Sequence, residues 1–243
     1  MSYRHLTLER EVDLASLDPS ISSLFTDRHW ELVLINLIAP SELLIQEFLA
    51  NIHDHKVRSF STFLRGSHIR ITPNVISHTL GLPLVVNPVC HYQWNTMPPR
   101  DEIASYFHGS PMEWHERSFK TNLLTRPRMV VCWIMLFNLF PVKHFSSLSE
   151  DKVLFLYTLL RGLPIDLPSH ICSHMLDHFI FRKDDNFPYS CLIQHLIMGL
   201  GVQFPDLLQV QLSKLINHTM FKQCQAHFRC CSPSPDDPLM MLL

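Results

Sequence analysis

Hydrophobic and polar positions along the chain predict a series of short helices separated by proline-marked connections. In several segments, apolar residues recur at three- and four-residue spacing, with a capping residue or Pro near the start and often Gly at the end. We expect helices at residues 27–38, 41–52, 98–109, 125–140, 151–162, 168–181, 189–201 and about 206–228.

One stretch alternates with a period of two instead. Ile69 and Ile71 are separated by polar residues, which is the pattern of a half-buried strand, and the Arg65-Gly66 pair before them is typical of a tight turn. Residues 57–64 would supply the partner strand. The sequence therefore predicts one small β-hairpin near residues 57–71.

A short helix is predicted directly after this hairpin. Thr72 is a suitable N-cap, and Pro73 fits the first helical position because its missing N–H leaves no hydrogen bond unmade there. Gly81 is a suitable C-terminal residue, since glycine takes the left-handed conformation at little cost.

The composition favours helices over a turn-rich β fold, because the chain has 17 Pro but only 6 Gly. Its 243 residues, 47% of them hydrophobic, are enough to build one sizeable core. The predicted fold class is therefore mainly α, a single helical domain with the one small hairpin. We expect an N-terminal arm at 1–26, the helical domain at 27–228 and a disordered tail at 229–243.

Charge and cysteine content indicate an intracellular protein, either nuclear or cytoplasmic. The formal net charge of −2 gives no global field that would attract nucleic acid or an anionic membrane. The 7 Cys are scattered, and the polar first residues do not resemble a secretory leader, so we expect no secretion. The longest apolar run, 129–142, is shorter than the ~20 residues of a membrane-spanning helix and contains Asn138 and Pro141.

Four blocks of sequence carry a family resemblance: WELVLINLIAPSELLIQEFLANI, FLRGSHIRITPNVISHTLGLP, MVVCWIMLFNLFPVKHFSSLSEDKVLFLYTLLRGLPIDL and FPYSCLIQHLIMGLGV. In order and spacing they resemble the plant transposon protein domain, which occurs in plant proteins derived from mobile elements and often in gag-like regions of retrotransposons. The matching positions are Glu47-Phe48, Ala50-Asn51, Arg65-Gly66, Leu80-Gly81-Leu82-Pro83, Pro141, His144, Ser146, Asp151, Tyr157, Pro188 and Gly201-Val202.

The resemblance covers roughly residues 28–205, and Leu49 departs from the family's usual Tyr at that position. It implies a mobile-element origin and a shared fold. It carries over no catalytic residue.

Two clusters of metal-ligating residue types lack the spacing of established metal sites. His170, His174 and His178 share one helical face, but no Glu stands in the H-E-x-x-H position and no fourth ligand is identifiable. The segment CQAHFRCC, residues 224–231, lacks the separated ligand pairs of a tetrahedral zinc site. We therefore expect no metal and no cofactor.

The candidate site is a basic hairpin with interleaved aromatic residues. Phe60 and Phe63 alternate with cations, and Asp54 is the only acid between residues 53 and 70. Such a hairpin can hold RNA or single-stranded DNA and stack its bases, or it can be a solvated edge whose charges prevent aggregation, which is the interpretation that we favour. The candidate nucleic-acid-binding residues are Lys56, Arg58, Arg65, His68 and Arg70.

These observations leave two classes of function. The first is a non-catalytic helical interaction domain of gag-like, mobile-element origin, with a protein partner or self-association and no membrane. The second is a nucleic-acid-binding module that uses the basic hairpin. An enzyme comes third, because the acids come mostly as adjacent pairs at helix starts or in a loop, and no nucleophile or phosphate-binding motif is present.

Overall fold

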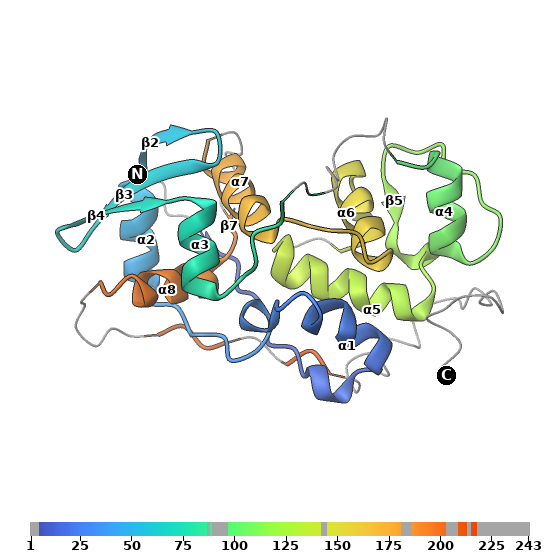
Figure 1. Cartoon of the computed structure of the whole chain (residues 1–243), viewed down its shortest axis with the longest axis horizontal. Helices are drawn as coiled ribbons and strands as arrows, with labels where there is room; N and C mark the ends of the chain where they lie inside the picture. Colours follow the sequence, from blue (N-terminus) through green and yellow to red (C-terminus); the bar gives the residue numbers. More distant parts are fainter. Residues whose placement is uncertain are drawn as a thin grey trace.

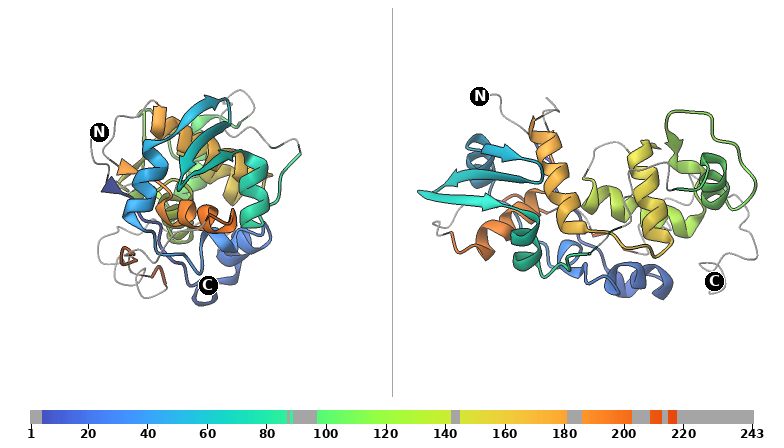
Figure 2. Two further views of the ribbon diagram at one scale, coloured as in Figure 1. Left: turned by 90° about the vertical axis from the view of Figure 1, so that its left-hand side faces the viewer. Right: turned by 45° about the horizontal axis from the view of Figure 1, so that its top comes forward.

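The computed structural model describes residues 5–86, 88, 97–141, 145–180, 186–202, 209–212 and 215–217. The molecule is elongated (Figure 1). A three-stranded sheet with α2, α3, α7 and α8 forms one half, and α4, α5, α6 and β5 form the other. Helix α1 packs against α5, and two further views show the same arrangement (Figure 2).

Short helices dominate the described chain. A π-helical turn, η5 (Met135–Leu139), continues α5, and short 3₁₀ turns occur at η1 (Leu14–Ser16), η2 (Glu31–Val33) and η4 (Thr121–Leu123). The α-helices are α1 (Pro19–Thr26), α2 (Glu42–Ala50), α3 (Pro73–Leu80), α4 (Arg100–His108), α5 (Arg126–Ile134), α6 (Glu150–Leu160), α7 (Leu167–Ile180) and α8 (Ser190–Gly199).

The predicted fold class, mainly α with one small hairpin, is wrong. Among the described residues, helices account for 49% and strands for 13%, so the fold is mixed α/β. The hairpin is present as β3 (Ser59–Leu64) and β4 (Ser67–Ile71), but β2 (His53–Lys56) adds a third antiparallel strand. Every residue of β2 is exposed, so its sequence lacks the alternation that would have indicated a strand.

Two-residue strands join distant parts of the chain and add to the β content. β1 (His5–Leu6) pairs in parallel with β7 (Asn186–Phe187), and β5 (Phe119–Lys120) pairs antiparallel with β6 (Ser147–Leu148). Strands this short have no measurable periodicity, so sequence patterns do not reveal them.

The predicted final helix, about 206–228, is also wrong where the structure describes it. Gln209 forms an isolated bridge with Ser41, and Ile216 forms another with Val12. These partners lie far away in the sequence, and residues 209–212 and 215–217 are not helical. The rest of this predicted helix and the predicted tail, 229–243, lie outside the described residues.

The N-terminal part of the chain differs from the expectation as well. Residues 5–26 fold onto the rest of the molecule, although the sequence indicated an extended arm. The Asp18 side chain caps α1 by accepting a 2.8 Å hydrogen bond from the Ser20 N–H, and Phe25 is fully buried. The helix expected at 27–38 does not form, because His29 and Asn36 adopt positive φ angles.

The core runs through both halves of the molecule. The longest apolar run of the sequence forms α5 and η5, whose residues are buried with few exceptions. Eight large side chains from this region and from α6 form the centre of the core, and all of them are buried. These are Trp133, Leu136, Phe137, Phe140, Leu154, Leu156, Tyr157 and Leu160.

Candidate interaction surface on the three-stranded sheet

Successive side chains of the sheet alternate between two faces, one buried and the other only partly exposed to solvent. The buried face packs on α2, where the Thr62 hydroxyl donates a 2.6 Å hydrogen bond to the Phe48 carbonyl. The register pairs Phe63 with His68 and His53 with Ser61 on the opposite side, where Phe63, His68 and His53 are exposed but Ser61 is buried. We call the exposed residues of that side, with the turn that joins β2 to β3, the sheet surface. It consists of His53, Lys56, Val57, Arg58, Phe63, His68 and Arg70.

Two tight turns shape this surface. Leu64 pairs with Ser67, so Arg65 and Gly66 form a two-residue loop with φ angles of 49° and 79°, as a type I′ turn requires. The turn predicted at these residues is confirmed. At the other end, Lys56 pairs with Ser59, and the loop between them leaves Val57 92% exposed.

All five predicted nucleic-acid-binding residues are exposed, but the structure separates them into two groups. The Arg65 Nε lies 3.0 Å from the Glu47 Oε2, and the Arg65 backbone N–H donates to the other oxygen of the same carboxylate at 2.9 Å. Arg70 lies 3.6 Å from the Asp54 carboxylate. The positive charges of these two arginines are therefore partly compensated by neighbouring acids.

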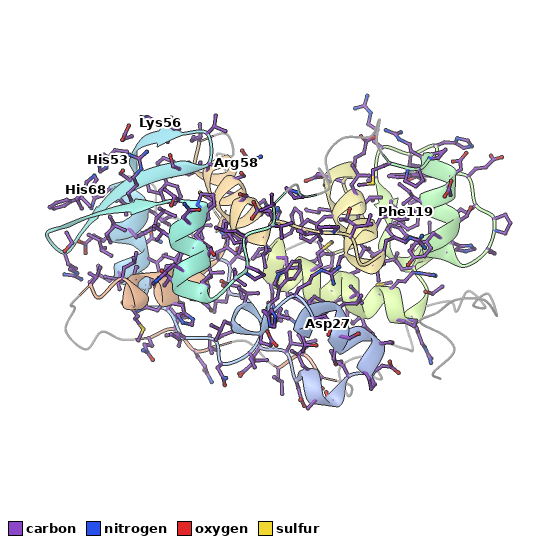
Figure 3. The ribbon with its side chains drawn as sticks, viewed as in Figure 1. Asp27, His53, Lys56, Arg58, His68 and Phe119 are labelled. Carbon is purple, nitrogen blue, oxygen red and sulfur yellow. The ribbon has the colours of Figure 1, made fainter. Side chains whose placement is uncertain are left out.

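Lys56, Arg58 and His68 make up the second group. Within the described part of the chain, neither Lys56 nor Arg58 forms an ion pair. His68 lies beside His53, with 5.3 Å between the ring centroids, and Figure 3 shows the two rings next to each other on the same half of the molecule as Lys56 and Arg58. The uncompensated positive charge of the hairpin is thus centred on the β2–β3 turn.

Three residues that matter here were not among the predicted site residues. Glu47 was missed because it comes from α2, and only the folded register brings it to Arg65. His53 was missed because β2 was not recognised as a strand. Phe63 was noted with Phe60, but the structure distinguishes them. Phe60 is buried against Phe48, whereas Phe63 is 48% exposed.

The histidines of α7 lie in the core. His170, His174 and His178 are all buried. The His170 Nε2 lies 2.9 Å from the Leu139 carbonyl oxygen, which also accepts a hydrogen bond from the Tyr189 hydroxyl at 2.5 Å. These rings therefore pack α7 against the end of η5. Across the residues that the structure describes, no group of three or more His, Cys, Asp or Glu is arranged to hold a metal ion.

The described cysteines are also buried, and their thiols are poor nucleophiles. Burial raises the pKa of Cys172 to about 12, and it raises the pKa values of Cys132 and Cys191 as well. A thiol reacts through its thiolate, so these groups are inert at neutral pH. The segment 224–231, the second cluster considered for metal, lies outside the described residues.

These features describe a mixed α/β domain with buried thiols and imidazoles and an exposed sheet surface. Over residues 26–203 the sequence matches the family described as "Putative plant retrotransposon-related domain". Because the match spans more than half of the chain, the protein belongs to this family, and the resemblance to plant mobile-element proteins is confirmed. No curated protein and no solved structure matches the chain. None of the described helices combines the length and apolar character needed to cross a membrane.

Proposed function

We propose that the protein is a non-catalytic interaction domain, of mobile-element origin, that binds an anionic partner through the sheet surface. The observation that carries this proposal is the β2–β3 turn, where Lys56 and Arg58 flank a Val57 side chain that is 92% exposed. Two uncompensated cations beside an exposed apolar side chain suit a partner that supplies both negative charge and an apolar contact.

Charge also decides which kind of protein partner fits. Two copies of this chain that met through the same turn would bring like charges together, which disfavours self-association at this site. An acidic segment of another protein has the complementary charge. We therefore take an acidic protein segment with apolar residues as the first candidate partner, in an intracellular compartment.

The absence of catalysis is part of the proposal. It is supported by the burial of the described thiols, with the resulting rise in their pKa values, and by the packing role of the α7 histidines. Such groups are removed from solvent and from any external substrate.

Single-stranded nucleic acid is the second candidate, and a specific observation favours it. Phe63 is half-exposed on β3 and is paired across the strands with His68, whose ring lies beside that of His53. Aromatic rings on a sheet can stack bases while neighbouring cations contact phosphates. Lys56 and Arg58, in the turn that leads into β3, supply the positive charge for such contacts.

The experiment compares two anionic probes, a single-stranded oligouridylate and a glutamate-rich peptide containing leucine, by fluorescence anisotropy at two salt concentrations. The double variant Lys56→Glu/Arg58→Glu should weaken binding of the true partner, and for RNA it should reduce the salt slope by about 1.4, or about 0.7 for each phosphate contact. The double variant Arg117→Glu/Lys120→Glu is the control. It makes the same charge change on exposed residues in the half of the molecule that contains α4 and β5, and it should leave binding unchanged.

A second variant distinguishes the two partners. Phe63→Ala should lower RNA affinity, because base stacking on an aromatic side chain contributes about 1–3 kcal/mol. Binding of the peptide alone supports the first candidate, and RNA binding that depends on Phe63 supports the second. If neither probe binds at low salt, or if both double variants weaken binding equally, the sheet surface is not the contact site and the proposal fails.

A further inference from the structure

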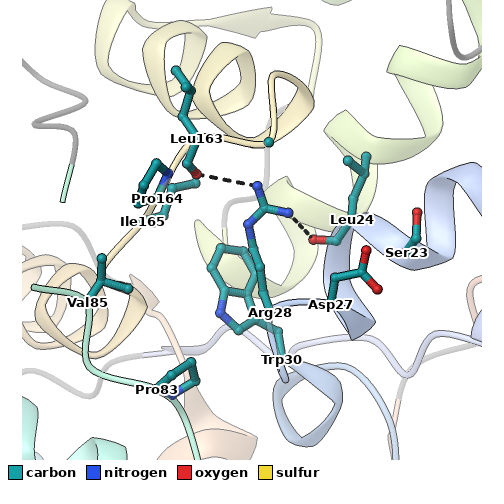
Figure 4. Close-up of a pocket in the computed structure, with 11 residues that line it drawn as sticks. Ser23, Leu24, Asp27, Arg28, Trp30, Pro83, Val85, Leu163, Pro164 and Ile165 are labelled. Carbon is teal, nitrogen blue, oxygen red and sulfur yellow. Dashed lines mark hydrogen bonds between the residues drawn. The ribbon is translucent and has the colours of Figure 1, made fainter.

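A cavity of about 410 Å³ lies between the two halves of the molecule, away from the sheet surface. Its walls come from three separate parts of the chain: the end of α1 with the turn that follows, the segment after α3, and the segment after α6 (Figure 4). The size is within the range of small-molecule sites. The apolar part of the lining consists of Leu24, Trp30, Pro83, Val85, Leu163, Pro164 and Ile165.

Arg28 supplies the positive charge in this cavity, and its position is fixed. One terminal nitrogen of the guanidinium donates a 2.6 Å hydrogen bond to the Leu24 carbonyl, and the other donates longer bonds, each 3.4 Å, to the carbonyls of Leu159 and Leu163. The guanidinium carbon lies 5.6 Å from the centre of the Trp30 ring. Figure 4 shows the bonds to Leu24 and Leu163 across the cavity.

The charge of Arg28 is incompletely compensated. Among the described residues, no carboxylate lies within ion-pair distance of its guanidinium. Burial lowers the pKa of Arg28, while the negative charge of Asp27, an exposed residue that also lines the cavity, acts in the opposite direction. A guanidinium has five N–H donors, so the three carbonyl bonds leave donors available for a ligand.

We propose that this cavity binds a carboxylate attached to an apolar group, with Arg28 as the partner of the carboxylate. The donors left on Nε and Nη1 can bond a carboxylate oxygen, and charge-assisted bonds of this kind are stronger than neutral ones. A phosphate is disfavoured, because a single cation among apolar walls would leave most of its second charge uncompensated. The apolar wall formed by Val85, Pro164 and Ile165 accommodates a branched aliphatic or aromatic group.

Two sources can supply this chemistry, a free organic acid or the C-terminal carboxylate of a peptide. The probes are therefore 4-methylpentanoate, its amide, and a tripeptide that ends in leucine with a free carboxylate. Binding is followed by intrinsic tryptophan fluorescence, because Trp30 lines the cavity, and by calorimetry. We expect at least one acid to bind saturably. The affinity of the amide should be lower by a factor of about ten or more, and a tenfold ratio corresponds to about 1.4 kcal/mol.

Two variants test the site within the folded protein. Arg28→Lys keeps the charge but loses the fixed guanidinium with its remaining donors, and it should weaken acid binding several-fold. Val85→Trp fills the cavity without touching the bonds of Arg28 and should abolish binding. Val86→Trp is the matched control, because Val86 is 87% exposed and is not part of the lining.

The relative affinities of the tripeptide and 4-methylpentanoate show which source of the carboxylate the cavity prefers. Tighter binding of the tripeptide indicates a peptide terminus, and equal or tighter binding of 4-methylpentanoate indicates a free acid. The proposal is overturned if neither acid binds, if acid and amide bind equally, or if Val86→Trp abolishes binding as Val85→Trp does. Because none of these residues belongs to the sheet surface, failure here leaves the proposed interaction with an anionic partner unaffected.

Discussion

Glu9 is a fully buried carboxylate that holds the start of α8. Its two oxygens accept hydrogen bonds from the backbone N–H groups of Cys191 and Leu192, at 3.0 and 2.9 Å. Burial raises the pKa of Glu9 above its ordinary value, although these two hydrogen bonds act against the rise. The positive end of the helix dipole makes this a favourable place for a carboxylate.

The raised pKa predicts the sign of a pH effect on stability. As pH rises from the ordinary carboxyl range, the unfolded chain loses the Glu9 proton before the folded protein does. The folded state then binds more protons, so the free energy of unfolding falls until pH exceeds the raised pKa. Glu9→Gln does not titrate and should lack this part of the pH dependence. Denaturant midpoints measured across pH for both proteins test this.

A control separates this effect from a general loss of charge. Glu113→Gln removes a carboxylate whose side chain is 78% exposed and lies 2.9 Å from His115, and since an exposed pair of this kind contributes little to stability, its pH dependence should follow that of the wild type closely. Parallel curves for wild type and Glu9→Gln would show that Glu9 does not couple to folding in this range.

Among individual residues, the sequence identified the charged side chains of the hairpin but not their ion-pair partners. Lys56, Arg58, Arg65 and Arg70 are close in sequence, so their grouping was predictable. The pairing of Arg65 with Glu47 depends on how α2 packs against the sheet, which no local pattern encodes. Charge reversal at Arg65 would therefore disturb this turn and is a poor probe of binding.

At the scale of elements, local signals predicted α3 well. The Thr72 hydroxyl accepts a 3.2 Å hydrogen bond from the Val75 N–H, Pro73 opens the helix, and Gly81 ends it in the left-handed conformation. Each of these signals acts within a few residues, which is why the sequence alone was sufficient. The exposed strand β2 carries no such signal, and it was missed.

The contact between α3 and α8 predicts that the effect of Gly199→Ala on stability depends on the size of the side chain at position 79. A Cβ atom on Gly199 would lie 2.3 Å from the Thr79 Cγ2, closer than side chains approach one another. Gly199→Ala should therefore destabilise the protein by about 1–2 kcal/mol, as overpacking does. In a Thr79→Ser background, which removes that methyl group, the same change should be neutral or stabilising by up to about 1 kcal/mol, because Ala favours helix over Gly.

Urea unfolding of the two single variants and the double variant completes this cycle. A coupling energy near zero would contradict the close approach of the two helices. Thr79 is partly exposed, so the Thr79→Ser change alone should have a small effect.

At the scale of the whole molecule, the N-terminal segment joins parts of the chain that are far apart in sequence. β1 pairs with β7, the Val12 N–H donates to the Leu34 carbonyl at 2.8 Å, and the Ile216 N–H donates to the Glu11 carbonyl at 2.7 Å. These pairings depend on contacts across the whole fold, so the sequence indicated an arm where the structure has a connector. The mixed α/β class was missed because β2 is wholly exposed and the two-residue strands are too short to show a pattern.

Asn138 offers a test of this connector. It is 1% exposed, its Oδ1 accepts a 2.8 Å hydrogen bond from the Arg10 N–H, and its Nδ2 donates a 2.9 Å bond to the Arg10 carbonyl. Asn138→Ala leaves two partly buried backbone groups without these bonds, so it should lower the free energy of unfolding by about 2–4 kcal/mol.

Asn51→Ala is the matched control. Asn51 also bonds a backbone carbonyl, that of Phe63, but this bond is exposed to solvent, so the effect of its loss should stay within about 1 kcal/mol. Guanidinium unfolding gives both values, and hydrogen exchange should show faster exchange at the Val12 and Ile216 amides in Asn138→Ala than in the wild type. Equal stabilities for the two variants, with unchanged exchange, would mean that the N-terminal segment does not hold the two parts of the fold together.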